Sequence, residues 1–384
     1  MRTWTDRLSL SATARNTRDF YRSPSGAGGG PAGQMLRFER ISAHLLPGLA
    51  LRAHAWRMLY RSTSALGQPN VVSGTVLVPR APYPGPRPLI GYAIGTQGHG
   101  THCAPSLQLT VGTEYETALI ATVLRRGWAV ALTDYPGLGY GSGHPYVVGR
   151  ALSPAVLDSM RAARQLPDAG LTPDGPAALF GYSEGGTAAG WAAQLQPTYA
   201  PDIPLAAVAV GGAAADMNFN HDFLTGGRFA WLLAYVALGY ASAYPELDLH
   251  AHLNDRGHRM ISAIAESHII PQVLTRLPRK FNKTRYLTTD LFAAPDWQAR
   301  FTENRLGALA PATPVLLTHG RADQAVGYGQ APQLRDDWRR LGVDVTFHGY
   351  RGLEHFTAAV AHMHTSLPWL ATHLTETQSR SAAA

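Results

Sequence analysis

The feature that most constrains the fold of this chain is a serine in a glycine-flanked turn between an apolar strand and a small-residue helix. Residues 177–196 read AALFGYSEGGTAAGWAAQLQ, so that Gly181 and Gly185 flank Ser183 in a G-x-S-x-G pattern. A serine on such a turn leaves no room for Cβ atoms two residues before and after it, which accounts for the glycines. The pattern predicts a serine nucleophile raised above a sheet edge at a helix N-terminus. A tight turn without chemistry is the alternative.

Length and composition favour a large folded protein. The chain has 384 residues, of which 45% are hydrophobic and 15% are charged. This is enough for one α/β domain with an insertion, or for two ordinary domains, and it excludes a disordered or coiled-coil chain.

The charge balance is basic but diffuse. Lys and Arg number 33 against 26 Asp and Glu, which gives a formal charge of +7. The basic residues are scattered, and the densest cluster, at 276–285, contains five of them. We therefore expect a solvated surface and no nucleic-acid partner, with attraction to an anionic lipid interface as a secondary role.

Membrane and export signals are not apparent in the sequence. No apolar run reaches the ~18 residues of a membrane span, and the first 20 residues lack the apolar core of a signal peptide. On this evidence alone, either the protein stays in the cytoplasm or the given sequence has been trimmed. The single Cys103 excludes an intrachain disulfide.

Strand and helix patterns alternate along most of the chain. Residues 1–34 are predicted to form an N-terminal arm, and residues 35–212 and 311–378 to form the core. Apolar or β-branched runs predict strands at 51–62, 71–78, 88–94, 128–133, 177–182, 204–211, 314–318 and 343–348. Helices are predicted at 116–126, 153–166, 330–341 and 356–373, the second with Ser153 as N-cap and Pro154 at its first position. Disorder is expected in the last six residues.

Residues 213–310 interrupt this alternation. They are rich in aromatic residues and helical patterns, and the segment is far longer than the 2–6 residues of a normal strand–helix loop. We interpret it as an inserted helical cap. The whole pattern predicts a mostly parallel sheet with helices on both faces and one helical cap, which is the α/β-hydrolase arrangement.

A serine nucleophile needs a base and a group that orients the base. In a parallel sheet these groups gather after the carboxyl ends of the strands, which leaves His99, His102, His319, His348 and His355 as candidates. The chain order Ser, acid, His favours His355, on the loop after the last strand, with His348 as runner-up. Asp323 follows the preceding strand and is the predicted acid, although an Asp that caps a turn is common.

An oxyanion hole requires at least two donors. The N–H of Glu184, the residue after the nucleophile, is one. The second is expected from the loop after strand 88–94, where Gln97 can donate through its N–H and its side-chain amide. The Glu184 carboxylate also suits a helix N-terminus without any catalytic role.

Two further motifs predict no cofactor and no metal. The glycine run at 137–143 lacks the G-x-G-x-x-G spacing of a dinucleotide site, and no helix pattern opens directly from it. His250, His252 and His258 match no usual zinc spacing.

These motifs together resemble the secretory lipase family of α/β-hydrolases, known from yeasts and actinobacteria. The resemblance runs from Asp19 nearly to the C-terminus. It rests on the following pieces: DFY at 19–21, GTQG at 95–98, CAPS at 103–106, TDY at 133–135, GLG at 137–139, GHPY at 143–146, GYSEGG at 181–186, HGRAD at 319–323 and EHF at 354–356. Yeast members have an acid where Gln97 stands and also have disulfides.

The resemblance implies an exported acyl-ester hydrolase with Ser183, Asp323 and His355 as catalytic triad and with oxyanion donors at Gln97 and Glu184. It also implies a cap that holds an acyl tunnel and a small-molecule ester or lipid as substrate. An apolar acyl site or ordinary core packing explains the aromatic and leucine residues of the cap equally well, namely Phe223, Phe229, Trp231, Leu232, Leu233 and Tyr235.

Several activities remain open at this point. One is triacylglycerol hydrolysis, and another is cleavage or transfer of short or bulky acyl groups. A peptidase would require cap carboxylates such as Glu246 or Asp248 for the substrate amine. A non-catalytic ligand-binding scaffold is the alternative outside enzymes.

Overall fold

The computed structural model describes residues 19–24, 29–276 and 282–383. Of the predicted N-terminal arm at 1–34, residues 1–18 and 25–28 therefore lie outside the described residues. So does part of the basic cluster at 276–285.

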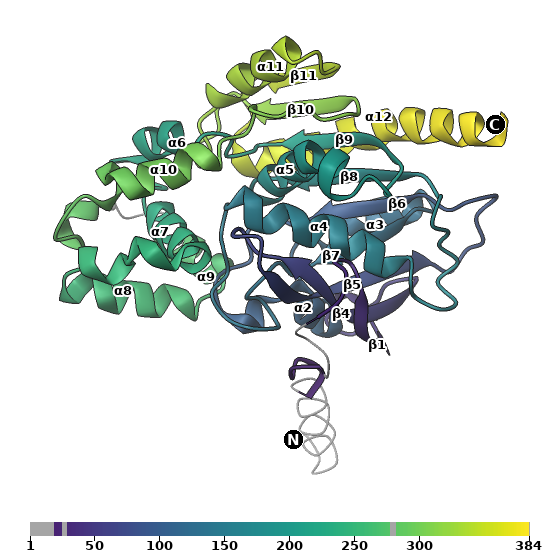
Figure 1. The fold of residues 1–384 in the computed structure, drawn as a ribbon, viewed down its shortest axis with the longest axis horizontal. Helices are drawn as coiled ribbons and strands as arrows, with labels where there is room; N and C mark the ends of the chain where they lie inside the picture. Colours follow the sequence, from purple (N-terminus) through teal and green to yellow (C-terminus); the bar gives the residue numbers. More distant parts are fainter. Residues whose placement is uncertain (1–18, 25–28, 277–281, 384) are drawn as a thin grey trace.

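A nine-stranded sheet forms the centre of the molecule (Figure 1). The strands lie in the order β1 (Met35–Ile41), β4 (Ala53–Thr63), β5 (Pro69–Pro79), β7 (Ala129–Thr133), β6 (Leu89–Ala93), β8 (Ala177–Tyr182), β9 (Leu205–Gly211), β10 (Val315–Gly320) and β11 (Val345–Tyr350). Along this order, the pairs β1–β4, β4–β5 and β5–β7 are antiparallel. All the following pairs, from β7–β6 to β10–β11, are parallel. A separate two-stranded ribbon pairs β2 (His44–Leu46) with β3 (Leu49–Ala50).

Helices cover both faces of this sheet (Figure 1). One face carries α4 (Gly149–Ala163), α5 (Glu184–Tyr199) and α11 (Gln330–Arg340), and the other carries α3 (Thr117–Arg125) and α12 (His355–Ala383). A short helix, α2 (Pro105–Val111), contacts β2 and β5. The predicted α/β-hydrolase fold class is confirmed, and the carboxyl ends of the parallel strands meet at one edge, where catalytic loops gather.

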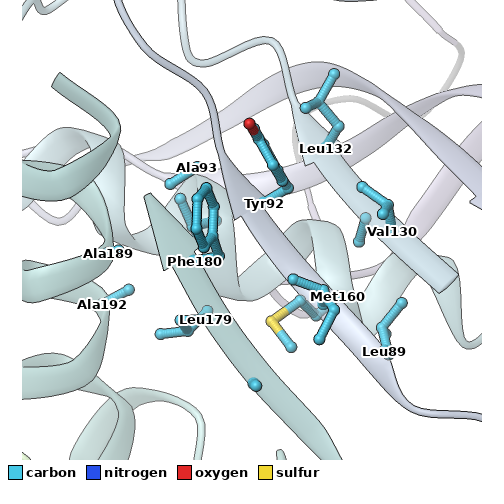
Figure 2. Close-up of a cluster of buried hydrophobic side chains, with 14 of the residues drawn as sticks. Leu89, Tyr92, Ala93, Val130, Leu132, Met160, Leu179, Phe180, Ala189 and Ala192 are labelled. Atoms are coloured by element: carbon cyan, nitrogen blue, oxygen red, sulfur yellow. The ribbon is translucent and has the colours of Figure 1, made fainter. Parts of the chain in front are cut away.

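The main core lies between the sheet and the helices. Figure 2 shows Tyr92 of β6 and Phe180 of β8 side by side, with Met160 of α4 between the neighbouring strands. The rings of Tyr92 and Phe180 are 5.0 Å apart, and all three side chains are at most 2% exposed. The central strands are apolar on both faces, as expected for parallel strands that helices cover on either side.

The segment 213–310, which we call the cap, lies beside the carboxyl ends of the parallel strands (Figure 1). Its α-helices are α6 (Met217–Leu224), α7 (Leu232–Ala243), α8 (Asp255–Ala265), α9 (Ile269–Arg276) and α10 (Pro295–Glu303). Most buried apolar side chains of the cap, among them Tyr235, Tyr240, Trp297 and Phe301, belong to a second hydrophobic cluster. This cluster also includes residues outside the cap, such as Tyr146 and Val326.

The structure differs from the sequence-based prediction at several elements, and β1, β2, β3 and α2 are additions to it. β1 was not predicted, because its alternating MLRFERI pattern is half exposed at a sheet edge. Helix α4 begins at Gly149 and includes Pro154, so that Ser153 does not cap it; the Ser153 hydroxyl donates to the Gly149 carbonyl at 2.8 Å. Helix α12 continues to Ala383, where disorder was expected.

Candidate active site

Ser183 lies on a strained turn between β8 and α5. Its φ and ψ are 60° and −121°, which place a non-glycine residue in a sparsely populated backbone region. A Cβ at Gly181 would overlap the carbonyl oxygen of Gly185, and a Cβ at Gly185 would overlap that of Ala93. The close approach of these backbones therefore requires both glycines of the motif.

The structure brings Ser183, His355 and Asp323 into one hydrogen-bonded line. His355 Nε2 lies 2.9 Å from Ser183 Oγ, and His355 Nδ1 lies 2.7 Å from Asp323 Oδ2. Asp323 comes from the loop after β10, and His355 is the first residue of α12. The Tyr182 hydroxyl donates to the His355 carbonyl at 2.7 Å and so ties the start of α12 to the serine turn.

The Asp323 carboxylate is held in its ionised form. The N–H groups of Ala325 and Val326 donate to Oδ1 at 2.9 and 2.8 Å. Burial alone would raise the pKa of Asp323, but the charge of His355 and the hydrogen bonds from His319 and His355 lower it well below its usual range. A buried, charged acid of this kind fixes the ring orientation and tautomer of the histidine that it faces.

The other candidate histidines do not reach the serine. His348 is exposed on the edge strand β11. His319 is buried and donates through Nε2 to the Val326 carbonyl at 2.9 Å, with Asp323 Oδ2 at 3.4 Å. His319 thus supports the acid and is not the base.

Gln97 occupies a different position from the one expected for its side chain. Its amide Nε2 is 3.3 Å from the Gly95 carbonyl and 3.2 Å from Glu114 Oε1, and its Oε1 accepts from Gln108 Nε2 at 2.8 Å. The side-chain amide is therefore engaged within a buried network, which leaves the N–H of Gln97 as the donor that faces no protein partner among the residues that the structure describes. Within the described residues, the N–H groups of Gln97 and Glu184 donate to no protein atom.

Sequence reasoning missed a group of polar residues that supports the loop 95–98. The Gly95 N–H and the Tyr92 hydroxyl donate to the two oxygens of Glu116, both at 2.8 Å. The Tyr115 hydroxyl donates to the Thr96 carbonyl, also at 2.8 Å. The available signal was the pair of acids in the GTEYE stretch at 112–116, which opens an apolar helix.

Glu114 and Glu116 are buried close to one another. Burial raises the pKa of Glu114, and the charge of Glu116 raises it further. Burial also raises the pKa of Glu116, although hydrogen bonds from Tyr92 and Gly95 oppose the shift. The pair can therefore retain a proton at a pH where exposed carboxyls are charged.

The Glu184 side chain has a specific partner. Its Oε1 lies 2.7 Å from His144 Nε2, and both side chains are fully buried. His144 comes from the GHPY stretch at 143–146, to which the sequence analysis gave no role. The pair anchors the residue that follows the nucleophile.

A largely apolar cavity of about 410 Å³ opens at Ser183 and His355. The cap contributes Phe229, Trp231 and Leu232 to its wall, which is one of the two roles that the sequence left open for them. Leu233 and Tyr235 are buried in the same hydrophobic cluster as Phe229 and Trp231 but do not line the cavity. Phe223 is 42% exposed.

Within the described residues, no cluster of three His, Cys, Asp or Glu residues is arranged to hold a metal ion. His250 and His258 stack on one another, with their Nδ1 atoms 3.2 Å apart. None of the described helices has both the length and the hydropathy needed to cross a membrane.

Comparison with solved structures supports the fold. Lipase A from Candida antarctica matches with a TM-score of 0.83 at 23% identity, over 94% of this chain and 87% of that chain. The rice cell wall degrading esterase LipA from Xanthomonas oryzae matches with a TM-score of 0.71 at 20% identity, over 87% of this chain and 95% of that chain.

Sequence comparison adds the family. A probable inactive lipase of Mycobacterium tuberculosis is 29% identical over 364 residues, which is 91% of this chain and 80% of that protein. Lipase 4 of Candida albicans is 28% identical over 373 residues, with the same two coverages. A secreted triacylglycerol lipase of Malassezia furfur is 28% identical over 302 residues, 74% of this chain and 77% of that protein. The secretory lipase family model matches residues 103–381, more than half of the chain, and the protein therefore belongs to the secretory lipase family.

Proposed function

We propose that this protein hydrolyses carboxylic esters with lipid acyl groups through an acyl-enzyme on Ser183. The observation that carries the proposal is the unbroken line from Ser183 Oγ through the His355 ring to Asp323, at the mouth of an apolar cavity. Membership of the secretory lipase family supports a hydrolase.

The reaction proceeds in two halves. Ser183 Oγ attacks the ester carbonyl carbon while its proton passes to His355 Nε2, and the carbonyl oxygen becomes an oxyanion. The carbonyl re-forms as the C–O bond to the alcohol breaks, and His355 returns the proton to the leaving alcohol. Water then attacks the acyl-enzyme by the same route, which releases the carboxylic acid and restores Ser183.

The remaining groups lower the barrier for these steps. Asp323 holds the Nδ1 proton of His355 and stabilises the imidazolium as it forms. The N–H groups of Gln97 and Glu184 are the proposed oxyanion donors, and removal of one such donor typically costs about 10²–10³ in kcat. No cofactor takes part in this scheme.

The proposed substrate follows from the cavity. Its wall is apolar apart from a few polar groups, and its volume lies within the range of about 300–1,000 Å³ typical of ligand sites. We assign the acyl chain to this cavity and the unit 213–310 to the role of substrate cover. The related protein of Malassezia furfur is described as a secreted triacylglycerol lipase, which supports the same substrate class and an extracellular location here.

Exposed apolar side chains also suit adsorption to a lipid interface. Phe356 and Val360, which line the cavity, are 50% and 48% exposed, and Ile270 of the cap is 41% exposed. A net charge of +7 favours an anionic surface.

Labelling with a fluorophosphonate, followed by a chain-length series, tests the proposal. We expect the folded protein to be labelled at Ser183 and to cleave p-nitrophenyl esters of long acids as well as emulsified triglyceride. A peak at acetate with no activity on the emulsion would instead indicate a short-chain esterase. Faster product formation with an added alcohol than with water would indicate an acyltransferase.

The description of one relative makes a non-catalytic alternative concrete. The related Mycobacterium tuberculosis protein is described as a probable inactive lipase. If folded wild-type protein is not labelled at Ser183, the chain is a ligand-binding scaffold and the proposed hydrolysis is wrong.

A further inference from the structure

The cap contacts the core through a short backbone pairing at the loop that carries the proposed oxyanion donor. Residues 267–269, between α8 and α9, form an antiparallel bridge in which His268 lies opposite Gly98. The Ile269 N–H donates to the Gln97 carbonyl at 2.8 Å, and the His99 N–H donates to the Ser267 carbonyl at 3.2 Å. Helix α9, which continues from this bridge, lies on the side of the cap nearest the core (Figure 1).

Gly98 is shaped for this contact. Its φ of 136° belongs to a region that side chains rarely adopt. A Cβ there would overlap the Ser267 carbonyl oxygen and would lie 2.9 Å from Cys103 Sγ and 3.0 Å from His268 Cα. The core loop is therefore built to receive the cap backbone at this point.

A chain of side chains runs through the same junction. His268 Nε2 lies 2.9 Å from Gln108 Oε1, Gln108 Nε2 lies 2.8 Å from Gln97 Oε1, and Gln97 Nε2 lies 3.2 Å from Glu114 Oε1. His268 is half-buried, and the other three residues are at most 5% exposed. A broken link would leave a buried amide without a partner, which is costly.

Backbone groups set the direction of this chain. The Ile270 N–H donates to His268 Nδ1 at 3.1 Å, so that the ring proton lies on Nε2 and points to Gln108. Gln108 also donates to the Cys103 carbonyl at 2.6 Å, which turns its amide nitrogen toward the core and its oxygen toward His268. Each residue therefore donates to the next, from the cap to Glu114.

The direction requires a neutral His268. A second ring proton on Nδ1 would oppose the Ile270 N–H, since both groups are donors. Partial burial and the nearby His102 lower the pKa of His268, which favours the neutral ring.

The chain ends on the peptide groups of the loop. The Gln97 amide also lies 3.3 Å from the Gly95 carbonyl. In a trans peptide the C=O and the N–H point in opposite directions, so this bond orients the Thr96 N–H. By the same geometry, the bond from the Tyr115 hydroxyl to the Thr96 carbonyl orients the Gln97 N–H.

We propose that His268 is a positioning residue for the oxyanion loop. Through Gln108 and Gln97, it couples the docking of the cap segment 267–269 to the peptide that joins Gly95 and Thr96, next to the proposed donor Gln97. The cap thus completes the hydrolytic site as well as covering it. This inference rests on the proposed ester hydrolysis, because the oxyanion that the loop would bind forms in that reaction.

Steady-state kinetics on a p-nitrophenyl ester test the inference, with rates expressed per fluorophosphonate-labelled site. His268→Phe keeps a ring but removes the donor, and we expect kcat to fall about ten-fold with little change in KM, because the loss affects the transition state alone. His268→Gln keeps a donor and should recover most of the rate. His258→Phe, the same replacement on cap helix α8, should have wild-type kinetics.

A double-variant cycle separates this path from general damage to the fold. Gln108→Met breaks the chain from the core side and should lower kcat to a similar extent. This variant tests the inference even if His268→Phe fails to fold. The double variant should be no slower than the slower single variant, because both changes interrupt one path. Losses that multiply, or a wild-type kcat in His268→Phe, would overturn the inference while the hydrolysis stands. A wild-type protein that is neither labelled nor active would overturn both.

Discussion

The two sides of the cavity are built in different ways. On the core side, Ser183, Asp323 and His355 each follow the carboxyl end of a parallel strand, and hydrogen bonds of 2.7 and 2.9 Å join them. On the cap side, Phe229, Trp231 and Leu232 present apolar surface from a separate hydrophobic cluster. The core side is fixed by the sheet, whereas the cap side is fixed by helix packing.

This difference separates chemistry from selectivity. Substitutions on the core side should act on the reaction with any ester, because every substrate requires the same proton transfers. Substitutions in the cap wall should act on the choice of acyl chain. The bridge at 267–269 is the exception that we propose, since there a cap segment acts on the reaction itself.

The largest effect is expected for the nucleophile. Ser183→Ala should lower kcat by roughly 10⁵–10⁶-fold for every ester, because no other group can form the acyl-enzyme. Progress curves with acetate and long-chain p-nitrophenyl esters provide the measurement. Ser262→Ala, at a cap position outside the cavity, is the matched control and should be fully active.

A smaller loss is expected for the acid. Asp323→Asn should lower kcat by about 10⁴-fold, because the amide favours the wrong tautomer of His355. Asp336→Asn, on the exposed face of α11, serves as control. An Asp323→Asn variant within ten-fold of wild type would contradict the assigned role.

The cap wall should change the substrate preference and leave the chemistry intact. Leu232→Ala should lower kcat/KM for long-chain esters about ten-fold, since it removes apolar contact with the chain, and should leave acetate cleavage nearly unchanged. Leu238→Ala is the control on the same helix, because Leu238 is also half-buried against the cap cluster but does not line the cavity. Equal losses on acetate and on long chains would break the distinction between the two sides.

The smallest effect concerns stability. The pKa of Glu116 is raised in the folded protein, so the folded state binds the proton more tightly than the unfolded chain does. The contribution of this carboxyl to stability is therefore full below its unfolded pKa of about 4.5 and is lost as the pH rises through the folded pKa. The Glu116→Gln variant lacks this titration. Relative to wild type, its free energy of unfolding should therefore gain about 1–3 kcal/mol between pH ~5 and pH ~9.

Denaturant unfolding at the two pH values measures this difference. Glu376→Gln, an exposed position on α12, should leave the pH dependence as it is in the wild type. A Glu116→Gln variant with the same pH dependence as wild type would show that the buried acid does not bind an extra proton.

The core side could be predicted from the sequence, whereas the cap side could be predicted only in part. The strand patterns and the glycines that flank Ser183 are local signals. The order of Ser183, Asp323 and His355 along the chain limited the choice of base and acid for the serine. The position of the Gln97 side chain depends on Gln108, Glu114 and the cap, which are distant in sequence, and no local pattern encodes it. The same holds for the start of α4. Pro154 suggested that the helix begins beside it, but the helix begins at Gly149, which packs closely against Trp191.

Trapping of the acyl-enzyme tests the central claim most directly. Wild-type protein mixed with a long-chain p-nitrophenyl ester, quenched in acid and digested, should yield one acylated peptide, with the acyl group on Ser183. The acyl-enzyme should accumulate because p-nitrophenolate leaves readily. The Ser183→Ala variant should yield none. Turnover without an acyl group on Ser183, or with an acyl group on another residue, would contradict the account.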